Sequence, residues 1–167
     1  LATEGAVNVM RRGGNAVDGA VAAALILGVV DPQNSGIGGG CFILIRLADG
    51  QMIAIDGRET APAAAHRDMY LRNGQPQQGL SQTGPLAAGT PGALAAYERV
   101  VRQYGKTKFK DMILSAAKFA ENGFKVSGAL AARLKATTAT LLRFKASRVA
   151  FLKGDSQPYR KGETLKL

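Results

Sequence analysis

Residues 41–62 read CFILIRLADGQMIAIDGRETAP. Two apolar runs in this stretch, Cys41–Leu47 and Gln51–Ile55, are separated by Ala-Asp-Gly, and an Asp-Gly pair between apolar runs is a strong signal of a β-hairpin. Because side chains alternate across a strand, Ile53 and Ile55 share one face of the second run. The stretch therefore predicts two antiparallel strands joined by a tight turn.

Arg58 directly follows the second predicted strand, on a loop position of the kind that often carries binding residues. A guanidinium presents a planar fork of N–H donors that matches the two oxygens of a carboxylate, and it stays charged at any working pH. Arg58 is therefore a candidate to bind a substrate through a carboxylate group, although its spacing alone favours an ion pair with a neighbouring residue. The alternative is an ion pair between Arg58 and Asp56 or Glu59 at a surface turn, because exposed ion pairs are common.

Helices are predicted on both sides of the hairpin. Ala16–Val30 is apolar on nearly every side, which is typical of a buried helix, and Asp31-Pro32 ends it because proline disfavours helical backbone in the residue before it. The other predicted elements are a helix over Glu4–Arg12 capped by Thr3, a short helix at Arg67–Leu71, a helix from Pro91 to Tyr104 capped by Thr90, a helix over Phe109–Glu121, a helix from Gly128 to Ala136 or somewhat beyond capped by Ser127, and a closing loop or short strand at Val149–Leu152.

The glycine-rich loop Asn34–Gly40 is not expected to bind phosphate. It leads into a strand rather than from a strand into a helix, and no Lys-Ser or Lys-Thr pair follows it. We expect either left-handed backbone in this loop or backbone packed too closely against its neighbours for any Cβ atom.

Composition predicts one compact domain over residues 1–167. The chain is 46% hydrophobic and 20% charged, as in globular proteins, and it contains no repeat or linker that would divide it. Cys41 is the only cysteine and is predicted to be a small core residue rather than a nucleophile. His66 is the only histidine, so neither a zinc centre nor a serine–histidine triad is expected, and no metal or cofactor is predicted.

The net charge of +10 is concentrated in residues 99–167, which carry sixteen basic and four acidic side chains. Nucleic acid is not the expected partner, because the basic residues are scattered with little aromatic interleaving and no binding motif. No segment is long and apolar enough to span a membrane. The chain starts at Leu1 rather than methionine, and we expect a processed or truncated chain in which an export signal would not be visible.

Several motifs in a fixed order resemble the large subunit of the γ-glutamyltranspeptidases. They are GGNAVD at 13–18, DP at 31–32 with SGIGGG at 35–40, DGRETAP at 56–62, GTPG at 89–92, YG at 104–105, the stretch 117–123 before FKV, and KGETL at 161–165. The resemblance covers essentially all 167 residues.

This resemblance implies an α+β fold that forms part of the αββα sandwich of an N-terminal-nucleophile (Ntn) hydrolase. It also implies a zymogen that cuts itself into a large and a small subunit, and a heterodimer whose small subunit begins with the nucleophilic threonine. The implied reaction is hydrolysis or transfer of the γ-glutamyl group of glutathione and related compounds, in the periplasm or outside the cell. The threonine's own α-amine would serve as the base, since a terminal amine titrates near neutral pH.

The Thr-Thr-His motif that begins the small subunit in that family is absent here, and Thr137-Thr138-Ala139 lacks its histidine. The family's oxyanion-hole serines and the acidic residue for the substrate amine also belong to the small subunit. We therefore predict no catalytic residue in this chain and an isolated chain that is inactive. Only Arg58 is assigned, because the resemblance implies that the arginine of DGRETAP binds the α-carboxylate of the γ-glutamyl group.

Two other functions stay open. One is a related acylase that acts on cephalosporin side chains or on poly-γ-glutamate. The other is a non-catalytic binding module that uses the basic surface of residues 99–167.

Overall fold

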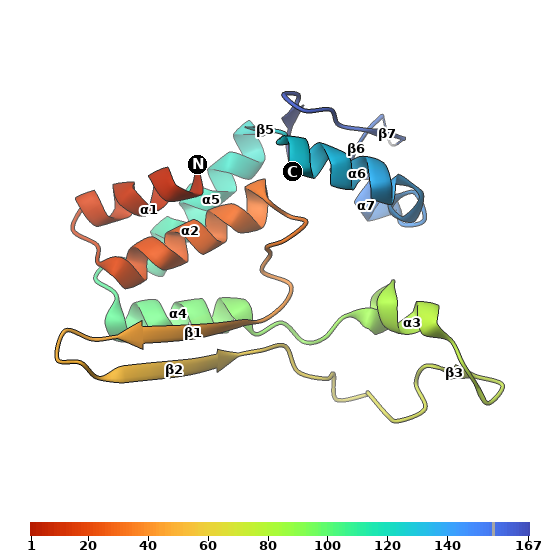
Figure 1. Ribbon diagram of the computed structural model, residues 1–167, viewed down its shortest axis with the longest axis horizontal. Helices are drawn as coiled ribbons and strands as arrows, with labels where there is room; N and C mark the ends of the chain where they lie inside the picture. Colours follow the sequence, from red (N-terminus) through yellow and green to blue (C-terminus); the bar gives the residue numbers. More distant parts are fainter. Residues whose placement is uncertain (155) are drawn as a thin grey trace. The chain divides into compact units, whose positions relative to one another are not determined.

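The computed structural model describes residues 1–154 and 156–167, which group into two compact units. The helical unit consists of Leu1–Gly36 and Tyr97–Leu167, and the hairpin unit consists of Ile37–Ala96. Each unit is described by itself (Figure 1). The single domain predicted over residues 1–167 stays a prediction.

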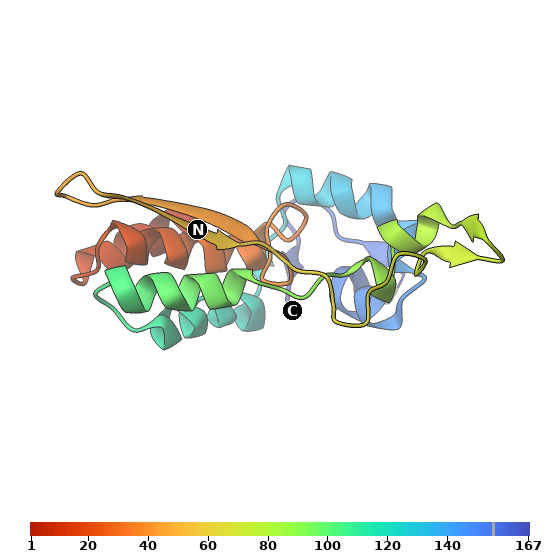
Figure 2. The same ribbon diagram turned by 90° about the horizontal axis from the view of Figure 1, so that it is seen from below.

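Three helices pack together in the helical unit: α1 (Ala2–Arg11), α2 (Ala16–Val30) and α5 (Phe109–Asn122). Helix α2 contacts both α1 and α5 (Figures 1 and 2), and its Leu25 and Ile26 are buried. The predicted bounds of α2 are confirmed at both ends. No helix in the described part of the chain, α2 included, is long and apolar enough to cross a membrane.

The predicted start of α1 is wrong. The helix begins at Ala2, so Thr3 lies inside its first turn and is exposed, and no side chain caps the helix. A cap must sit outside the helical backbone to accept a bond from an amide two or three residues on. The prediction for α5 is confirmed, with an end one residue beyond Glu121.

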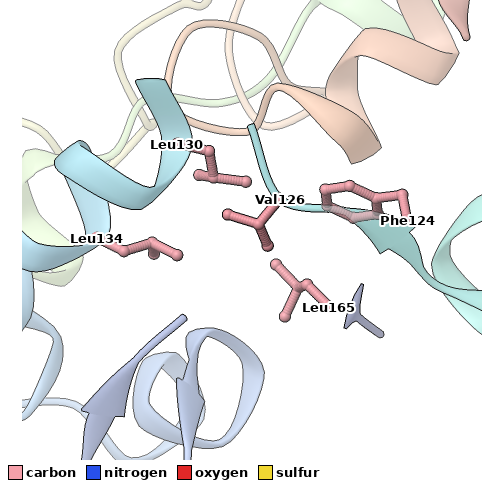
Figure 3. Close-up of a cluster of buried hydrophobic side chains, with 5 residues drawn as sticks. All are labelled: Phe124, Val126, Leu130, Leu134 and Leu165. Carbon is pink, nitrogen blue, oxygen red and sulfur yellow. The ribbon is translucent and has the colours of Figure 1, made fainter. Parts of the chain in front are cut away.

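The rest of the helical unit is built around a cluster of buried apolar side chains (Figure 3), namely Phe124, Val126, Leu130, Leu134 and Leu165. Strand β5 (Phe124–Lys125) pairs antiparallel with β8 (Thr164–Leu165), which brings the last residues of the chain onto the cluster. Helix α6 (Gly128–Leu141) contributes the two remaining leucines. The core therefore joins residues about forty positions apart in sequence.

Ser127 caps α6 as predicted, and its Oγ accepts a hydrogen bond from the backbone N–H of Leu130 at 3.1 Å. Replacing Ser127 with alanine leaves this partly buried donor without its acceptor. We expect Ser127→Ala to lower the free energy of unfolding by about 1 kcal/mol, measured by urea denaturation. Ser127→Asp keeps an acceptor and is the control; equal losses in the two variants would rule out the capping bond as the cause.

The chain end differs from its prediction. Most of Val149–Leu152 lies in helix α7 (Lys145–Phe151), and only the last residue enters a strand, β6 (Leu152–Lys153), which pairs with β7 (Gln157–Pro158). No side chain caps α7, but Phe151 packs against the apolar cluster. Tertiary packing, rather than a local start signal, accounts for this helix.

The hairpin unit contains β1 (Cys41–Arg46) and β2 (Met52–Gly57), which pair antiparallel as predicted. Ile45 and Ile55 are buried on one face. The opposite face exposes Phe42, Leu44 and Met52. The alternation predicted from sequence is therefore confirmed, and the strand bounds differ from the predicted ones by one or two residues.

The predicted short helix at Arg67–Leu71 is wrong. Turns occupy most of this segment, and its last residue begins β3 (Leu71–Arg72), which pairs with β4 (Gln75–Pro76). The two-residue turn Asn73-Gly74 has φ of 51° and 75°, the left-handed geometry that favours a tight hairpin over a helix. A short helix α3 (Gln78–Gln82) and a 3₁₀ turn η1 (Pro85–Ala87) follow.

Thr90 does not cap the next helix as predicted. Helix α4 (Ala93–Tyr104) begins three residues later, because Thr90 pairs instead with Thr60 in an antiparallel bridge with N···O distances of 2.8 and 3.1 Å. The amides of Gly92 and Ala93 both donate to the carbonyl of Gly39 at 3.1 Å. Backbone groups of another segment therefore satisfy the donors that a side-chain cap would have served.

Candidate functional site

Arg58 stands immediately after the last residue of β2, where the sequence placed it. Its backbone N–H donates to the Asp56 carboxylate at 2.9 Å, which fixes the turn that leaves the strand. Its side chain is 57% exposed, so the guanidinium is open to solvent and to a ligand.

The Arg58 guanidinium forms an ion pair with the next residue. Its Nη2 lies 3.1 Å from Glu59 Oε1, so the alternative ion pair weighed from the sequence exists, with Glu59 rather than Asp56 as the partner. A guanidinium has five N–H donors, and this contact uses one edge of them. An exposed ion pair contributes only about 0–1 kcal/mol to stability, so the guanidinium remains able to bind a second anion.

Phe42 provides a second contact, which sequence reasoning missed. The Arg58 Cζ lies 5.9 Å from the centroid of the Phe42 ring, within the range of a cation–π interaction. Phe42 is paired with Asp56 across the hairpin, so Arg58, two residues further along, lies diagonally opposite the ring on the same face. The strand register would have predicted this contact.

The helical unit contains a buried carboxylate that the sequence analysis also missed. Asp18 is fully buried. Its oxygens accept hydrogen bonds from the backbone N–H groups of Asn15 at 2.7 Å, Lys106 at 2.9 Å and Thr107 at 3.2 Å, and from the Thr107 hydroxyl at 2.8 Å. The Asn15 side chain in turn donates to the carbonyl of Tyr104 at 2.6 Å. Asp18 therefore ties the start of α2 to the loop between α4 and α5.

Burial alone would raise the pKa of Asp18, but the hydrogen bonds from Asn15, Lys106 and Thr107 together outweigh it and hold the pKa below the ordinary value of 3.8. The carboxylate is therefore ionised at neutral pH. Its local signal was present in the sequence, since Asn15 and Asp18 have the spacing of a capping box, and both reciprocal bonds of that box are formed.

The sequence of the whole chain matches a family profile. The profile described as gamma-glutamyltranspeptidase matches residues 2–167. The chain belongs to the γ-glutamyltranspeptidase family. Residues 2–167 include the DGRETAP stretch and every other motif on which the resemblance rests.

Two curated relatives of this γ-glutamyltranspeptidase family chain are enzymes named for glutathione. Glutathione hydrolase 2 of Arabidopsis thaliana is 46% identical over 138 residues, which are 83% of this chain and 23% of the relative. The glutathione hydrolase proenzyme of Escherichia coli (strain K12) is 41% identical over 165 residues, 98% of this chain and 28% of the relative. The chain thus spans about a quarter of the length of these relatives.

The fold agrees with the family. The crystal structure of Helicobacter pylori gamma-glutamyltranspeptidase matches with a TM-score of 0.94 at 40% identity, covering 99% of this chain and 48% of that chain. The predicted fold class, an α+β portion of the αββα sandwich of Ntn hydrolases, is confirmed.

The hydroxyl groups of Thr137 and Thr138 are both used in hydrogen bonds to backbone carbonyls. Within α6, Thr137 Oγ1 donates to the carbonyl of Arg133 and Thr138 Oγ1 to the carbonyl of Leu134, each at 2.8 Å. Hydroxyl groups bonded in this way to their own helix are common. The absence of a catalytic residue from the chain stays a prediction.

Proposed function

We propose that this chain is the N-terminal part of the large subunit of a γ-glutamyltranspeptidase, and that it contributes substrate recognition to an active site completed by a small subunit. The observation that carries the proposal is Arg58, an exposed guanidinium at the end of β2 within the DGRETAP motif. The names of the Arabidopsis thaliana and Escherichia coli relatives support glutathione and related γ-glutamyl compounds as the substrate class.

In the proposed complex, Arg58 binds the α-carboxylate of the γ-glutamyl group. The guanidinium keeps its contact with Glu59 and turns its remaining N–H donors toward the substrate. This places the charged end of the substrate at a fixed point and leaves the γ-amide to reach the nucleophile. The binding energy comes from charge-assisted hydrogen bonds that a neutral side chain does not make.

The proposed chemistry occurs on the N-terminal threonine of the small subunit. Its Oγ attacks the γ-carbonyl carbon while the terminal α-amine takes the hydroxyl proton. The C–N bond then breaks, the leaving amine receives the proton, and a γ-glutamyl ester remains on the threonine. Water or an acceptor amine attacks this ester and releases the γ-glutamyl product. A precursor that cleaves itself would generate the threonine, and we expect the enzyme to work in the periplasm or outside the cell.

The proposal is tested on the full-length protein that contains this chain. We expect intact-mass analysis to find a second polypeptide that begins with threonine, and the purified protein to release p-nitroaniline from γ-glutamyl-p-nitroanilide. Residues 1–167 alone should release none. Preferential cleavage of glutaryl-p-nitroanilide would favour the acylase function instead. Salt-sensitive nucleic-acid binding without any amide cleavage would favour the basic binding module.

A further inference from the structure

Two glycines from separate loops of the hairpin unit pack closely against the backbone at Arg58. The first is Gly40, at the end of the glycine-rich loop. A Cβ atom at Gly40 would lie 2.6 Å from the Cα of Arg58 and 2.5 Å from the backbone nitrogen of Glu59. Non-bonded carbon atoms are at their optimal separation near 3.5–4.0 Å, so only glycine fits here without displacing the Arg58 backbone.

The second glycine is Gly92, which immediately precedes α4. A Cβ atom at Gly92 would lie 2.6 Å from the carbonyl oxygen of Arg58 and 2.5 Å from that of Gly57. These two oxygens belong to the backbone, which cannot rotate aside as a flexible side chain can; at Gly40 the Glu59 carboxylate oxygen Oε2 stands in the way beside the backbone atoms. Gly40 therefore lies against the Cα of Arg58 and the amide of Glu59, and Gly92 lies against the carbonyl groups of Gly57 and Arg58.

Hydrogen bonds tie the two loops to each other and to the segment that follows Arg58. The carbonyl of Gly39 accepts from the amides of Gly92 and Ala93, each at 3.1 Å. Thr60 and Thr90 exchange both of their backbone hydrogen bonds, at 2.8 and 3.1 Å. These bonds couple the two loops to each other and to the backbone that follows Arg58.

The side-chain contacts of Arg58 are too weak to set its position. Its ion pair with Glu59 and its contact with Phe42 both involve a guanidinium that is largely exposed. Ion pairs of that kind add little and yield easily. The place from which the guanidinium reaches toward a ligand is therefore set by the backbone, which is held by the Asp56 carboxylate and packs closely against the two glycines.

We propose that Gly40 and Gly92 are positioning residues for carboxylate binding by Arg58. The inference rests on the proposed function of Arg58. A methyl group at either position pushes the Arg58 backbone by roughly 1 Å to restore an ordinary contact distance, and a misplacement of about that size lowers the rate of a well-positioned reaction by up to about a hundredfold. Because the chemistry lies at the other end of the substrate, the loss falls on KM more than on kcat.

The test compares Gly40→Ala and Gly92→Ala with the unaltered full-length enzyme on two substrates. One is γ-glutamyl-p-nitroanilide; the other is 4-aminobutanoyl-p-nitroanilide, which lacks only the α-carboxylate. We expect kcat/KM for the first substrate to fall about 10- to 100-fold, chiefly through KM, and kcat/KM for the second to stay unchanged. Gly38→Ala is the matched control, because a Cβ at Gly38 meets no described atom within 4 Å, and its kinetics should match those of the unaltered enzyme.

A graded variant keeps the test decisive if the first two fail to fold. A Cβ at Gly89 would lie 3.1 Å from both Glu59 Cγ and the carbonyl oxygen of Thr60, so Gly89→Ala requires a smaller shift and should raise KM to an intermediate degree. The positioning role requires that a shift of Glu59 and Thr60 reaches Arg58, so an unchanged KM in Gly89→Ala together with unfolded Gly40→Ala and Gly92→Ala would overturn it.

The outcome also separates this inference from the function on which it rests. If the unaltered enzyme prefers the substrate with the carboxylate and Arg58→Ala abolishes that preference, the proposed function of Arg58 holds. A folded Gly40→Ala enzyme that keeps the full preference then refutes the glycine role alone. If the unaltered enzyme has no preference at all, the function of Arg58 itself is wrong.

Discussion

Replacing Arg58 with alanine is expected to raise KM for γ-glutamyl-p-nitroanilide and to lower kcat/KM roughly 30- to 900-fold. This fall corresponds to a loss of about 2–4 kcal/mol of transition-state stabilisation. The reason is the loss of charge-assisted hydrogen bonds between the guanidinium and the substrate carboxylate. Because this carboxylate lies at the far end of the substrate from the scissile amide, kcat should change less than KM. Steady-state kinetics of the full-length enzyme measure both.

Arg67 provides a matched control for this variant. It is an exposed arginine of the same hairpin unit, and like Arg58 it forms an ion pair with the residue that follows it, with 3.4 Å between Arg67 Nε and Asp68 Oδ1. Arg67→Ala should leave both constants unchanged. Arg58→Lys keeps the charge but loses the planar fork, so its KM should lie between those of the unaltered enzyme and Arg58→Ala. Equal kinetics for Arg58→Ala and Arg67→Ala would remove the binding role.

Replacing Asp18 with alanine is expected to lower the free energy of unfolding by about 3–5 kcal/mol. The substitution leaves three partly buried backbone N–H groups and the Thr107 hydroxyl without their acceptor, at a position where the native side chain is fully buried. Denaturation in urea measures the loss. Glu4→Ala removes an exposed carboxylate from the first turn of α1 and should have an effect within about 0.5 kcal/mol.

The Asp18 carboxylate also makes the free energy of unfolding depend on pH in the acid range. The folded-state pKa of Asp18 is lowered below the ordinary value of 3.8, so the folded state binds its proton less readily than the unfolded state does. The contribution of the ionised group is therefore complete above pH 3.8 and is lost as the pH falls through the folded-state pKa. Asp18→Asn should remove this part of the acid sensitivity, and an Asp18→Asn protein that loses stability below pH 4 as steeply as the unaltered protein would contradict the assignment.

Local sequence signals predicted the parts of the fold whose causes are local. The bounds of α2 follow from a continuous apolar run that ends at Asp31-Pro32, and the hairpin follows from alternation around Asp-Gly. One prediction was wrong because distant backbone takes over a local role. Thr90 has the sequence of a helix cap, but Thr60, thirty residues away, pairs with its backbone.

The candidate site shows the same division. The place of Arg58 at the end of β2 could be derived from strand alternation. Its ion-pair partner, Glu59, was one of the two neighbouring carboxylates considered. The contact with Phe42 required the strand register. Asp18 bonds to residues 88 and 89 positions away, and nothing in the local pattern around Lys106 and Thr107 indicates that partner.

The central claim is that the Arg58 guanidinium and the substrate α-carboxylate bind each other, and a double-mutant cycle between protein and substrate tests it most directly. The cycle measures kcat/KM of the unaltered enzyme and of Arg58→Ala on γ-glutamyl-p-nitroanilide and on 4-aminobutanoyl-p-nitroanilide. We predict that removing the carboxylate lowers kcat/KM at least 30-fold in the unaltered enzyme and less than threefold in Arg58→Ala, since about 2 kcal/mol or more of coupling is lost once either partner is gone. An equal penalty in the two enzymes would contradict the account.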